Sequence, residues 1–252
     1  MLLKDYFPNL QKKYHELSFK GIAFNSQEVK EGYIFFAFKG NNTNGNFFIK
    51  DAIKNGSKII ITDKFKTHVT KKKILFLKVK NPRNLLAKFS SKIFNKKPNN
   101  LIAVTGTNGK SSIANFYFQI LTINRIKSAS IGTLGVSGLK IKKNYLNTTF
   151  DTIQINKILK KLKEKKIENV ILEASSHGLN QNRLDGLKFD IGIFTNLTRD
   201  HLDYHKTFKN YFNSKLILFK KLLKKKSYAI YDDELKISSN LNRITKSNKI
   251  KK

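Results

Sequence analysis

The sequence feature that most constrains the fold is the run Val-Thr-Gly-Thr-Asn-Gly-Lys-Ser-Ser at residues 104–112. The residues before it, 101–104, are apolar like a buried strand, and residues 112–123 have apolar side chains at helical spacing. A strand, a glycine loop with lysine and a hydroxyl residue, and then a helix form a phosphate-binding loop. The sequence therefore predicts a nucleotide site, with a purely structural turn as the alternative.

Each part of this loop suits phosphate chemistry. Gly106 and Gly109 let backbone N–H groups approach phosphate oxygens, Lys110 can reach the terminal phosphates, and Ser111 can hold Mg²⁺. The helix that follows presents the positive end of its dipole to the anion. The match is incomplete, because Val104 stands where the general phosphate-binding loop has a glycine.

The chain beyond this point alternates strands and helices, which predicts an α/β fold. We expect strands over residues 101–104, 128–131, 169–173, 191–195 and 228–231, and helices over residues 112–123, 152–165 and 208–223. Such alternation is typical of a doubly wound, mostly parallel sheet, which binds ligands at the carboxyl ends of its strands.

The preceding part of the chain predicts a smaller domain of mixed α/β type. Apolar runs at 33–38, 58–62 and 74–79 indicate strands, and residues 47–55 and 84–94 indicate helices. We divide the chain into an N-terminal domain at 1–95, a central domain at 96–234 and a polar, lysine-rich tail at 235–252. The composition of the tail indicates poor order.

Composition excludes several functions. The 50 Lys and Arg residues outnumber the 17 Asp and Glu residues, for a net charge of +33, but lysine is spread along the chain with the other residues of AT-rich codons. No nucleic-acid-binding motif accompanies the charge, so we expect no specific nucleic-acid partner. The absence of cysteine excludes disulfides and fits a cytoplasmic location. We expect no membrane contact, because no apolar run resembles a signal peptide or a membrane span.

Two more polar clusters follow predicted strands. Glu173 ends one strand, and a carboxylate facing a phosphate loop can hold Mg²⁺, although a solvated acid is the alternative. Arg183 follows it and could pair with a carboxylate or phosphate, although most such arginines are surface charges. Residues 200–205 hold two of the five histidines and two aspartates, which suits a metal or phosphate site; a helix cap and a packed histidine are the alternative.

These runs together resemble the Mur ligase family. Residues 105–112 resemble its ATP loop, and residues 25–37 resemble its uridine-binding segment. Residues 173–179 with Gln181 and Arg183, and residues 195–205, resemble the family members that add a diamino acid. The resemblance extends from about residue 22 to residue 234, with several motifs in order and spacing.

The resemblance implies a role for each matching residue. ATP would be bound by Gly106, Thr107, Asn108, Gly109, Lys110, Ser111 and Ser112. Mg²⁺ would be held by Ser111, Glu173, His201 and Lys215, the last as a carbamate. The UDP-linked substrate would be bound by Phe24, Ser26, Asn41, Asn42, Thr43, Asn147, Thr148, Thr149, Ser175, Gln181 and Arg183. The implied catalytic residues are Lys110, His201 and Lys215, although by its surroundings alone Lys215 would be a solvent-facing lysine in a helix.

The activity implied is that of an ATP-dependent ligase of peptidoglycan synthesis with Mg²⁺. It would join a diamino acid, with meso-2,6-diaminopimelate expected and lysine as the alternative, to UDP-N-acetylmuramoyl-L-alanyl-D-glutamate through an acyl phosphate. We expect a cytoplasmic monomer. The resemblance leads us to expect a partial central domain with uncovered apolar surface, without the C-terminal amino-acid-binding domain of the family.

Departures from the family pattern leave alternatives open. Phe150 replaces a proline of the family, and Ile230-Tyr231 replaces the usual Asn-Ala. An inactive remnant that binds only ATP or the UDP-linked substrate is one alternative. A folylpolyglutamate-type or alanine-adding ligase is another, which the UDP-type N-terminal segment and the histidine-containing runs disfavour.

Overall fold

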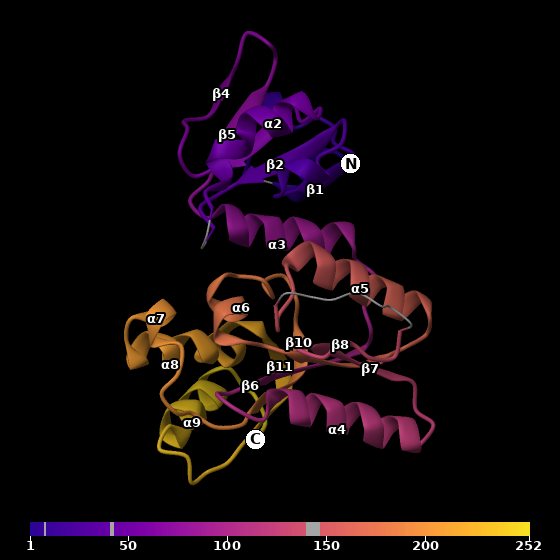
Figure 1. Cartoon of the computed structure of the whole chain (residues 1–252), viewed down its shortest axis with the longest axis vertical. Coiled ribbons are helices and arrows are strands. Elements are labelled where there is room, and N and C mark those ends of the chain that lie inside the picture. The colour runs from indigo at the N-terminus through magenta and orange to yellow at the C-terminus, as the bar shows by residue number, and fades with distance from the viewer. Residues whose placement is uncertain (8, 41–42, 140–146) are drawn as a thin grey trace. The chain divides into compact units, whose positions relative to one another are not determined.

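The computed structural model describes residues 1–7, 9–40, 43–139 and 147–252. The chain forms two compact units, Met1–Ile93 and Phe94–Lys252 (Figure 1). Both units combine a largely parallel sheet with helices, so the predicted α/β class is confirmed. In the described part of the chain no helix is both long and apolar enough to cross a membrane.

The first unit contains a five-stranded sheet with strand order β1-β2-β3-β5-β4, parallel except for the short edge strand β4. Its elements are α1 (Leu3–Tyr6), η1 (Lys12–Tyr14), β1 (Gly21–Ala23), η2 (Ser26–Glu28), β2 (Tyr33–Ala37), η3 (Gly45–Phe48), α2 (Ile49–Lys54), β3 (Ile59–Thr62), β4 (His68–Val69), β5 (Leu75–Lys78) and α3 (Pro82–Ile93). The three predicted strands are β2, β3 and β5, whereas β1 and β4 were not predicted.

The second unit contains a six-stranded sheet with strand order β11-β10-β6-β9-β7-β8, in which only β8 runs antiparallel to its neighbour. Its elements are β6 (Asn100–Thr105), α4 (Lys110–Ile123), β7 (Ser128–Gly132), β8 (Gly135–Val136), α5 (Thr152–Glu164), β9 (Asn169–Glu173), α6 (Ser176–Asn180), β10 (Phe189–Phe194), α7 (Leu202–His205), α8 (Phe208–Ile217), the π-helical turn η4 (Leu218–Leu222), β11 (Leu223–Tyr231) and α9 (Ser238–Ser247).

The two faces of this second sheet are covered unequally. Along β6, Leu101 and Ala103 point into the larger core, whereas Ile102 and Val104 point to the opposite face. The larger core includes residues of α5, α6, η4 and α9, and α4 lies on the other side of the sheet (Figure 1). Because β6 is the third strand in the order of six, the loop that follows it emerges near the middle of the sheet.

Two predictions about the C-terminal part were wrong. The segment expected to be a poorly ordered tail contains α9, whose Leu241 is fully buried in the larger core together with Ile250. The helix expected over residues 208–223 ends as α8 at Ile217, continues as the turn η4, and gives way to β11 at Leu223. The last strand is therefore longer than predicted.

Candidate functional site

The glycine loop joins β6 to α4 at the carboxyl edge of the sheet. It begins after Thr105 and ends where α4 starts at Lys110. A Cβ atom on Gly106 would lie 1.8 Å from Oγ1 of Thr195, so no side chain fits there. Gly109 has φ of 82°, in the left-handed region that favours glycine. Both glycines are therefore required by the shape of the loop.

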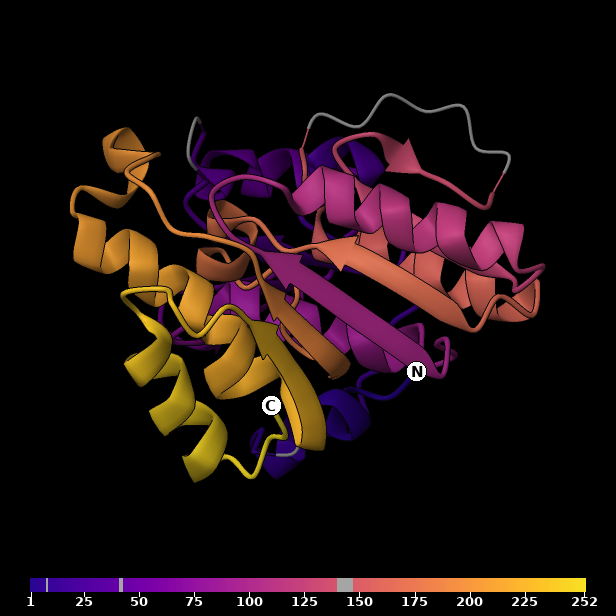
Figure 2. The ribbon, with the colours of Figure 1, turned by 90° about the horizontal axis from the view of Figure 1, so that it is seen from below.

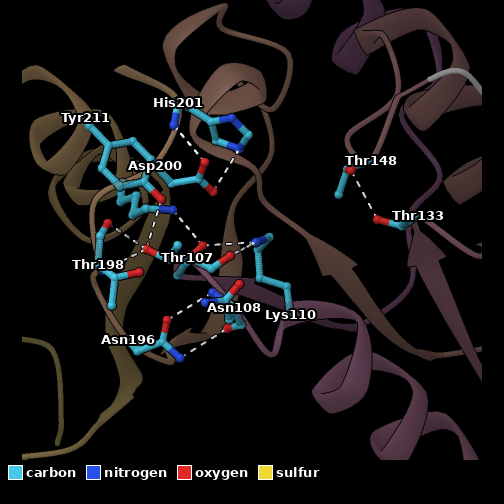
Figure 3. Close-up of polar contacts among 12 residues, drawn as sticks. Thr107, Asn108, Lys110, Thr133, Thr148, Asn196, Thr198, Asp200, His201 and Tyr211 are labelled. Atoms are coloured by element: carbon cyan, nitrogen blue, oxygen red, sulfur yellow. Dashed lines mark hydrogen bonds and ion pairs between the residues drawn. The ribbon is translucent and has the colours of Figure 1, made fainter. Parts of the chain in front are cut away.

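The loop after β10 holds the glycine loop in place. The backbone N–H of Thr107 donates to the carbonyl of Asn196 at 3.0 Å, and the N–H of Asn108 donates to Oδ1 of Asn196 at 2.9 Å. The Thr195 hydroxyl donates to the carbonyl of Asn108 at 2.6 Å. Figure 3 shows Asn196 facing Asn108 across this junction. We assigned no role to Thr195 or Asn196 from the sequence, because their contacts join segments almost 90 residues apart.

Lys110 folds back over the loop. Its Nζ donates to the carbonyls of Gly106 at 3.0 Å and Thr107 at 2.7 Å (Figure 3). Burial lowers the pKa of Lys110, while the nearby carboxylates of Glu173 and Asp200 act in the opposite direction. The ammonium group is thus held beside the loop by two carbonyl oxygens.

Glu173 is the centre of a second polar group at the end of β9. The Ser111 hydroxyl donates to Glu173 Oε2 at 2.9 Å, and the backbone N–H of Thr133 donates to Oε1 at 2.9 Å. The side chain of Glu173 occupies the space beside Gly132, where a Cβ atom would lie 2.1 Å from Oε1. The sequence interpretation missed Gly132 and Thr133, because their contacts with Glu173 span 40 residues or more.

A chain of hydrogen bonds connects five more of the predicted residues of this unit to Glu173. Thr149 Oγ1 donates to the backbone carbonyl of Glu173 at 2.7 Å and lies 3.0 Å from the Ser175 hydroxyl. The Arg183 guanidinium donates to the carbonyl of Thr149 at 2.5 Å and to Gln181 Oε1 at 2.8 Å. Thr148 also belongs to this group, because the Thr133 hydroxyl donates to the Thr148 hydroxyl at 3.1 Å (Figure 3). Asn147 and Ser112 are exposed.

Lys215 lies on α8 and is almost completely buried, at 1% exposure. The solvent-facing position that its surroundings predicted is therefore wrong. Its Nζ donates to the carbonyl of Gly106 at 2.6 Å and lies 4.5 Å from the centre of the Tyr211 ring. Burial, helped by the positive charge of Lys110, lowers the pKa of Lys215 to about 7. Two lysine side chains thus reach one carbonyl oxygen of the glycine loop.

His201 stands at the start of α7 with φ of 51°. Its Nε2 lies 3.4 Å from Asp200 Oδ2, and its backbone N–H donates to Oδ1 of the same carboxylate at 2.8 Å (Figure 3). The His201 ring lies 6.2 Å from the Tyr211 ring, against which Lys215 also packs. The structure therefore brings His201 and Lys215 to the same aromatic side chain.

Two more histidines lie beside His201: His205, which belongs to the predicted cluster at residues 200–205, and His177, to which we assigned no role. The His177 ring lies 4.8 Å from the His201 ring and 5.4 Å from the His205 ring. Burial, with the charges of His177 and His201, lowers the pKa of His205 to about 4, so this ring is neutral near pH 7. Only the tertiary fold shows this cluster, because His177 lies 24 residues before His201 in the sequence.

Comparison with known proteins identifies the fold. A model described as "Mur ligase middle domain" matches residues 104–252, which is more than half of the chain, and one described as "Mur ligase family, catalytic domain" matches residues 18–93. The chain belongs to the Mur ligase family.

Relatives within the Mur ligase family are longer than this chain. The UDP-N-acetylmuramoyl-L-alanyl-D-glutamate–2,6-diaminopimelate ligase of Rickettsia montanensis is 43% identical over 232 residues, which cover 90% of this chain and 48% of that protein. The ligase of the same name from Clostridium tetani is 40% identical over 223 residues, or 87% of this chain and 46% of that protein. The chain thus spans about half the length of the curated relatives it matches.

Solved structures agree with this assignment. A structure of a UDP-N-acetylmuramoyl-L-alanyl-D-glutamate–2,6-diaminopimelate ligase superposes with a TM-score of 0.83 at 26% identity, over 100% of this chain and 51% of that chain. The MurF ligase of Thermotoga maritima, solved in complex with ADP, has a TM-score of 0.59 at 20% identity and covers 92% of this chain and 49% of that chain. At that identity the second match supports the fold alone.

The donor groups of this Mur ligase chain suit Mg²⁺ better than a softer metal. Ser111 and Glu173 offer oxygen atoms next to the glycine loop, and Mg²⁺ is usually held by one or two such groups together with phosphates. Among the described residues, no three His, Cys, Asp or Glu side chains are grouped closely enough to hold a metal ion by themselves. The arrangement therefore fits an ion that is bound jointly with a nucleotide.

The predicted uridine-end residues lie in the first unit. The Phe24 ring stacks on the Phe38 ring at 6.1 Å, and the Arg83 guanidinium lies 4.8 Å from the centre of the Phe38 ring. Ser26 is buried at the start of η2, and Thr43 is exposed. Two further residues predicted for this group, Asn41 and Asn42, lie outside the described residues.

Proposed function

We propose that the chain provides the ATP-binding and UDP-substrate-binding parts of a ligase that extends UDP-N-acetylmuramoyl-L-alanyl-D-glutamate by a diamino acid. The incoming amino acid would be 2,6-diaminopimelate, as the names of the relatives from Rickettsia and Clostridium suggest. The observation that supports this proposal most strongly is the position of Lys110 and the Ser111–Glu173 pair beside one glycine loop.

The reaction must bring two anions together. The D-glutamyl carboxylate of the substrate would attack the γ-phosphorus of ATP, which forms an acyl phosphate and releases ADP. The amine of the diamino acid would then displace phosphate and form the amide bond. Such a reaction depends mainly on positioning and on positive charge around the transferred phosphoryl group.

The residues of this chain are suited to those two tasks. The Lys110 ammonium would exchange its carbonyl partners for oxygens of the terminal phosphates, and the backbone N–H groups of residues 106–112 would bind the remaining ones. Ser111 and Glu173 would hold Mg²⁺, which when bound neutralises phosphate charge and polarises the phosphoryl group. Arg183, with Gln181 and Ser175 beside it, would bind the pyrophosphate or the muramoyl peptide.

Lys215 would act as a carbamate together with His201. Because burial lowers its pKa to about 7, a substantial fraction of the amine is neutral at physiological pH and can attack CO₂. The nitrogen–carbon bond forms as the amine loses a proton, which converts a cation into an anion that can hold a second Mg²⁺. The His201 imidazole, which also lies near the Tyr211 ring, would be a second donor to that ion.

An assay of ADP release tests this function. The full chain is incubated with ATP, Mg²⁺, UDP-N-acetylmuramoyl-L-alanyl-D-glutamate and diaminopimelate, and ADP and the tripeptide product are measured. Steady ADP release that requires both substrates supports the ligase. Binding of ATP and of the UDP-linked substrate without product supports the alternative, a binding-only remnant, and absence of binding to both contradicts the proposal.

A further inference from the structure

Thr133 lies in the turn between β7 and β8, beside the carboxylate of Glu173. Strands β6 and β7 both run parallel to β9, so the segments that follow them meet at one edge of the sheet. In Figure 2 the arrows of β6 (purple) and β9 (orange) point to that edge. The backbone N–H of Thr133 donates to Glu173 Oε1 at 2.9 Å, and its hydroxyl donates to Oε2 at 3.2 Å. Thr133 therefore contacts both oxygens of the carboxylate that we propose for Mg²⁺.

The Thr133 hydroxyl has a second acceptor, the Thr148 hydroxyl, at 3.1 Å (Figure 3). The next residue, Thr149, fixes this segment, because its hydroxyl donates to the backbone carbonyl of Glu173 at 2.7 Å. The Arg183 guanidinium donates to the Thr149 carbonyl at 2.5 Å. Thr148 thus belongs to the group of residues that we propose for the UDP-linked substrate, and Thr133 joins that group to the carboxylate.

The Thr133 hydroxyl carries a single hydrogen, so it donates either to Glu173 or to Thr148 and not fully to both. The two distances are nearly equal, so the charge of the acceptor decides between them. A hydrogen bond to a charged acceptor is roughly twice as strong as one between neutral groups. While Glu173 carries its full negative charge, the hydrogen is directed to the carboxylate, and the bond from Thr133 does not orient the Thr148 hydroxyl.

A cation at Glu173 reverses this preference. A carboxylate that shares its charge with Mg²⁺ is a weaker acceptor, so the Thr133 hydrogen turns to Thr148. The Thr148 oxygen then accepts from Thr133, and its own hydrogen has to point away from Thr133. A hydroxyl that accepts a hydrogen bond is also a stronger donor, because successive hydrogen bonds polarise one another. Thr148 is thereby prepared to donate to an oxygen atom of an anionic ligand.

We infer that Thr133 is a positioning residue that couples Mg²⁺ at Glu173 to the binding of the UDP-linked substrate at Thr148. The inference rests on the function proposed above for these two sites. It adds that the ligand group at Thr148 is an anionic oxygen, since only an acceptor gains from a prepared hydroxyl donor. Coupling between two binding sites is reciprocal, so each ligand strengthens the binding of the other by the same factor.

Titration calorimetry of the full chain measures this coupling without turnover. The two ligands are UDP-N-acetylmuramoyl-L-alanyl-D-glutamate and a non-hydrolysable ATP analogue, with Mg²⁺ or with EDTA. We expect the analogue with Mg²⁺ to tighten substrate binding about fivefold, at the low end of the range for coupled sites, and the substrate to tighten binding of the analogue by the same factor. The saturating analogue in EDTA is expected to leave substrate affinity unchanged.

Three variants separate this role from a general effect on the fold. Thr133→Val keeps the shape of the side chain and the backbone bond to Glu173 but removes the hydroxyl, so the coupling factor should fall to about one in both directions. Thr133→Ser keeps a hydroxyl and should keep the coupling. Ser137→Ala removes a half-buried hydroxyl just after β8 and should leave the factor unchanged.

The outcomes distinguish this inference from the proposed function. If both ligands bind the unaltered chain independently, or if Thr133→Val keeps the full coupling factor, the inference is overturned while the proposed function stands. Loss of coupling in Thr133→Ser also overturns the inference, because the size of the side chain then matters and the hydroxyl does not. Failure of the unaltered chain to bind both ligands contradicts the proposed function, and the inference is lost with it.

Discussion

At the scale of single residues, the carboxylate of Glu173 depends on the missing side chain at Gly132. In Gly132→Ala the new Cβ atom would lie 2.1 Å from Glu173 Oε1, so the carboxylate must move and lose the 2.9 Å hydrogen bond from Ser111. We expect ATP affinity measured with Mg²⁺ to fall about tenfold, which corresponds to about 1.4 kcal/mol, and affinity in EDTA to change little. Titration calorimetry with and without Mg²⁺ measures both.

The matched control for this substitution is Ser130→Ala, a half-buried position on the same strand. It tests whether any change in β7 has the same effect. Equal affinity of Gly132→Ala and the unaltered chain in Mg²⁺ would show that Glu173 does not hold the ion.

The lowered pKa of Lys215 makes the free energy of unfolding depend on pH, and the sign of this dependence can be worked out. Its pKa falls from 10.5 to about 7 in the folded chain, so between these values the unfolded state binds more protons than the folded state. The free energy of unfolding therefore gains a contribution that rises with pH above 7, by up to about 1.4 kcal/mol per unit. We expect Lys215→Met to lose this contribution.

Urea unfolding between pH 7 and 9 in CO₂-free buffer measures this difference, and Lys161→Met, an exposed lysine on α5, is the control. A constant difference in the free energy of unfolding between Lys215→Met and the unaltered chain across this range would mean that the pKa of Lys215 is ordinary.

The burial of Lys215 was not predicted from the sequence, because lysine side chains are usually exposed. Lysine is rarely buried, and the local sequence around Lys215 contains nothing that marks it as an exception. Its burial results from packing under the glycine loop, 109 residues away in the sequence. Only the family resemblance gave it a role.

At the scale of elements, α9 is part of the core of the second unit. The segment is polar overall, but Ile237, Leu241 and Ile244 recur at helical spacing and contact the larger core, with Leu241 fully buried. Leu241→Ala should lower the free energy of unfolding by about 2–5 kcal/mol. Ser239→Ala, exposed on the same helix, should change it by less than about 0.5 kcal/mol.

Chemical denaturation monitored by circular dichroism compares the two variants. A loss below about 0.5 kcal/mol for Leu241→Ala would mean that α9 does not pack on the core in solution. We missed this helix in the sequence because three apolar residues among lysines and asparagines indicate disorder unless a partner surface is known.

At the scale of the whole molecule, local patterns predicted the order of the elements and tertiary contacts decided the site. The strand–loop–helix at residues 101–123 and the strand before Glu173 were recognisable because their apolar periodicity is regular. The roles of Thr195 and Gly132 could not be recognised in the same way, because each residue contacts a segment that is distant in the sequence. The topology explains the difference, since the loops after β6, β9 and β10 meet only at the edge of the folded sheet.

The central claim is that the glycine loop binds the phosphates of Mg·ATP. Titration calorimetry of the full chain with Mg·ATP tests it most directly, with Lys110→Ala compared against Lys161→Ala, an exposed lysine of α5. The claim predicts saturable binding that Lys161→Ala leaves intact and that Lys110→Ala weakens at least tenfold, because the ammonium group beside the loop is lost. Unchanged affinity in Lys110→Ala, or no binding by the unaltered chain, would contradict it.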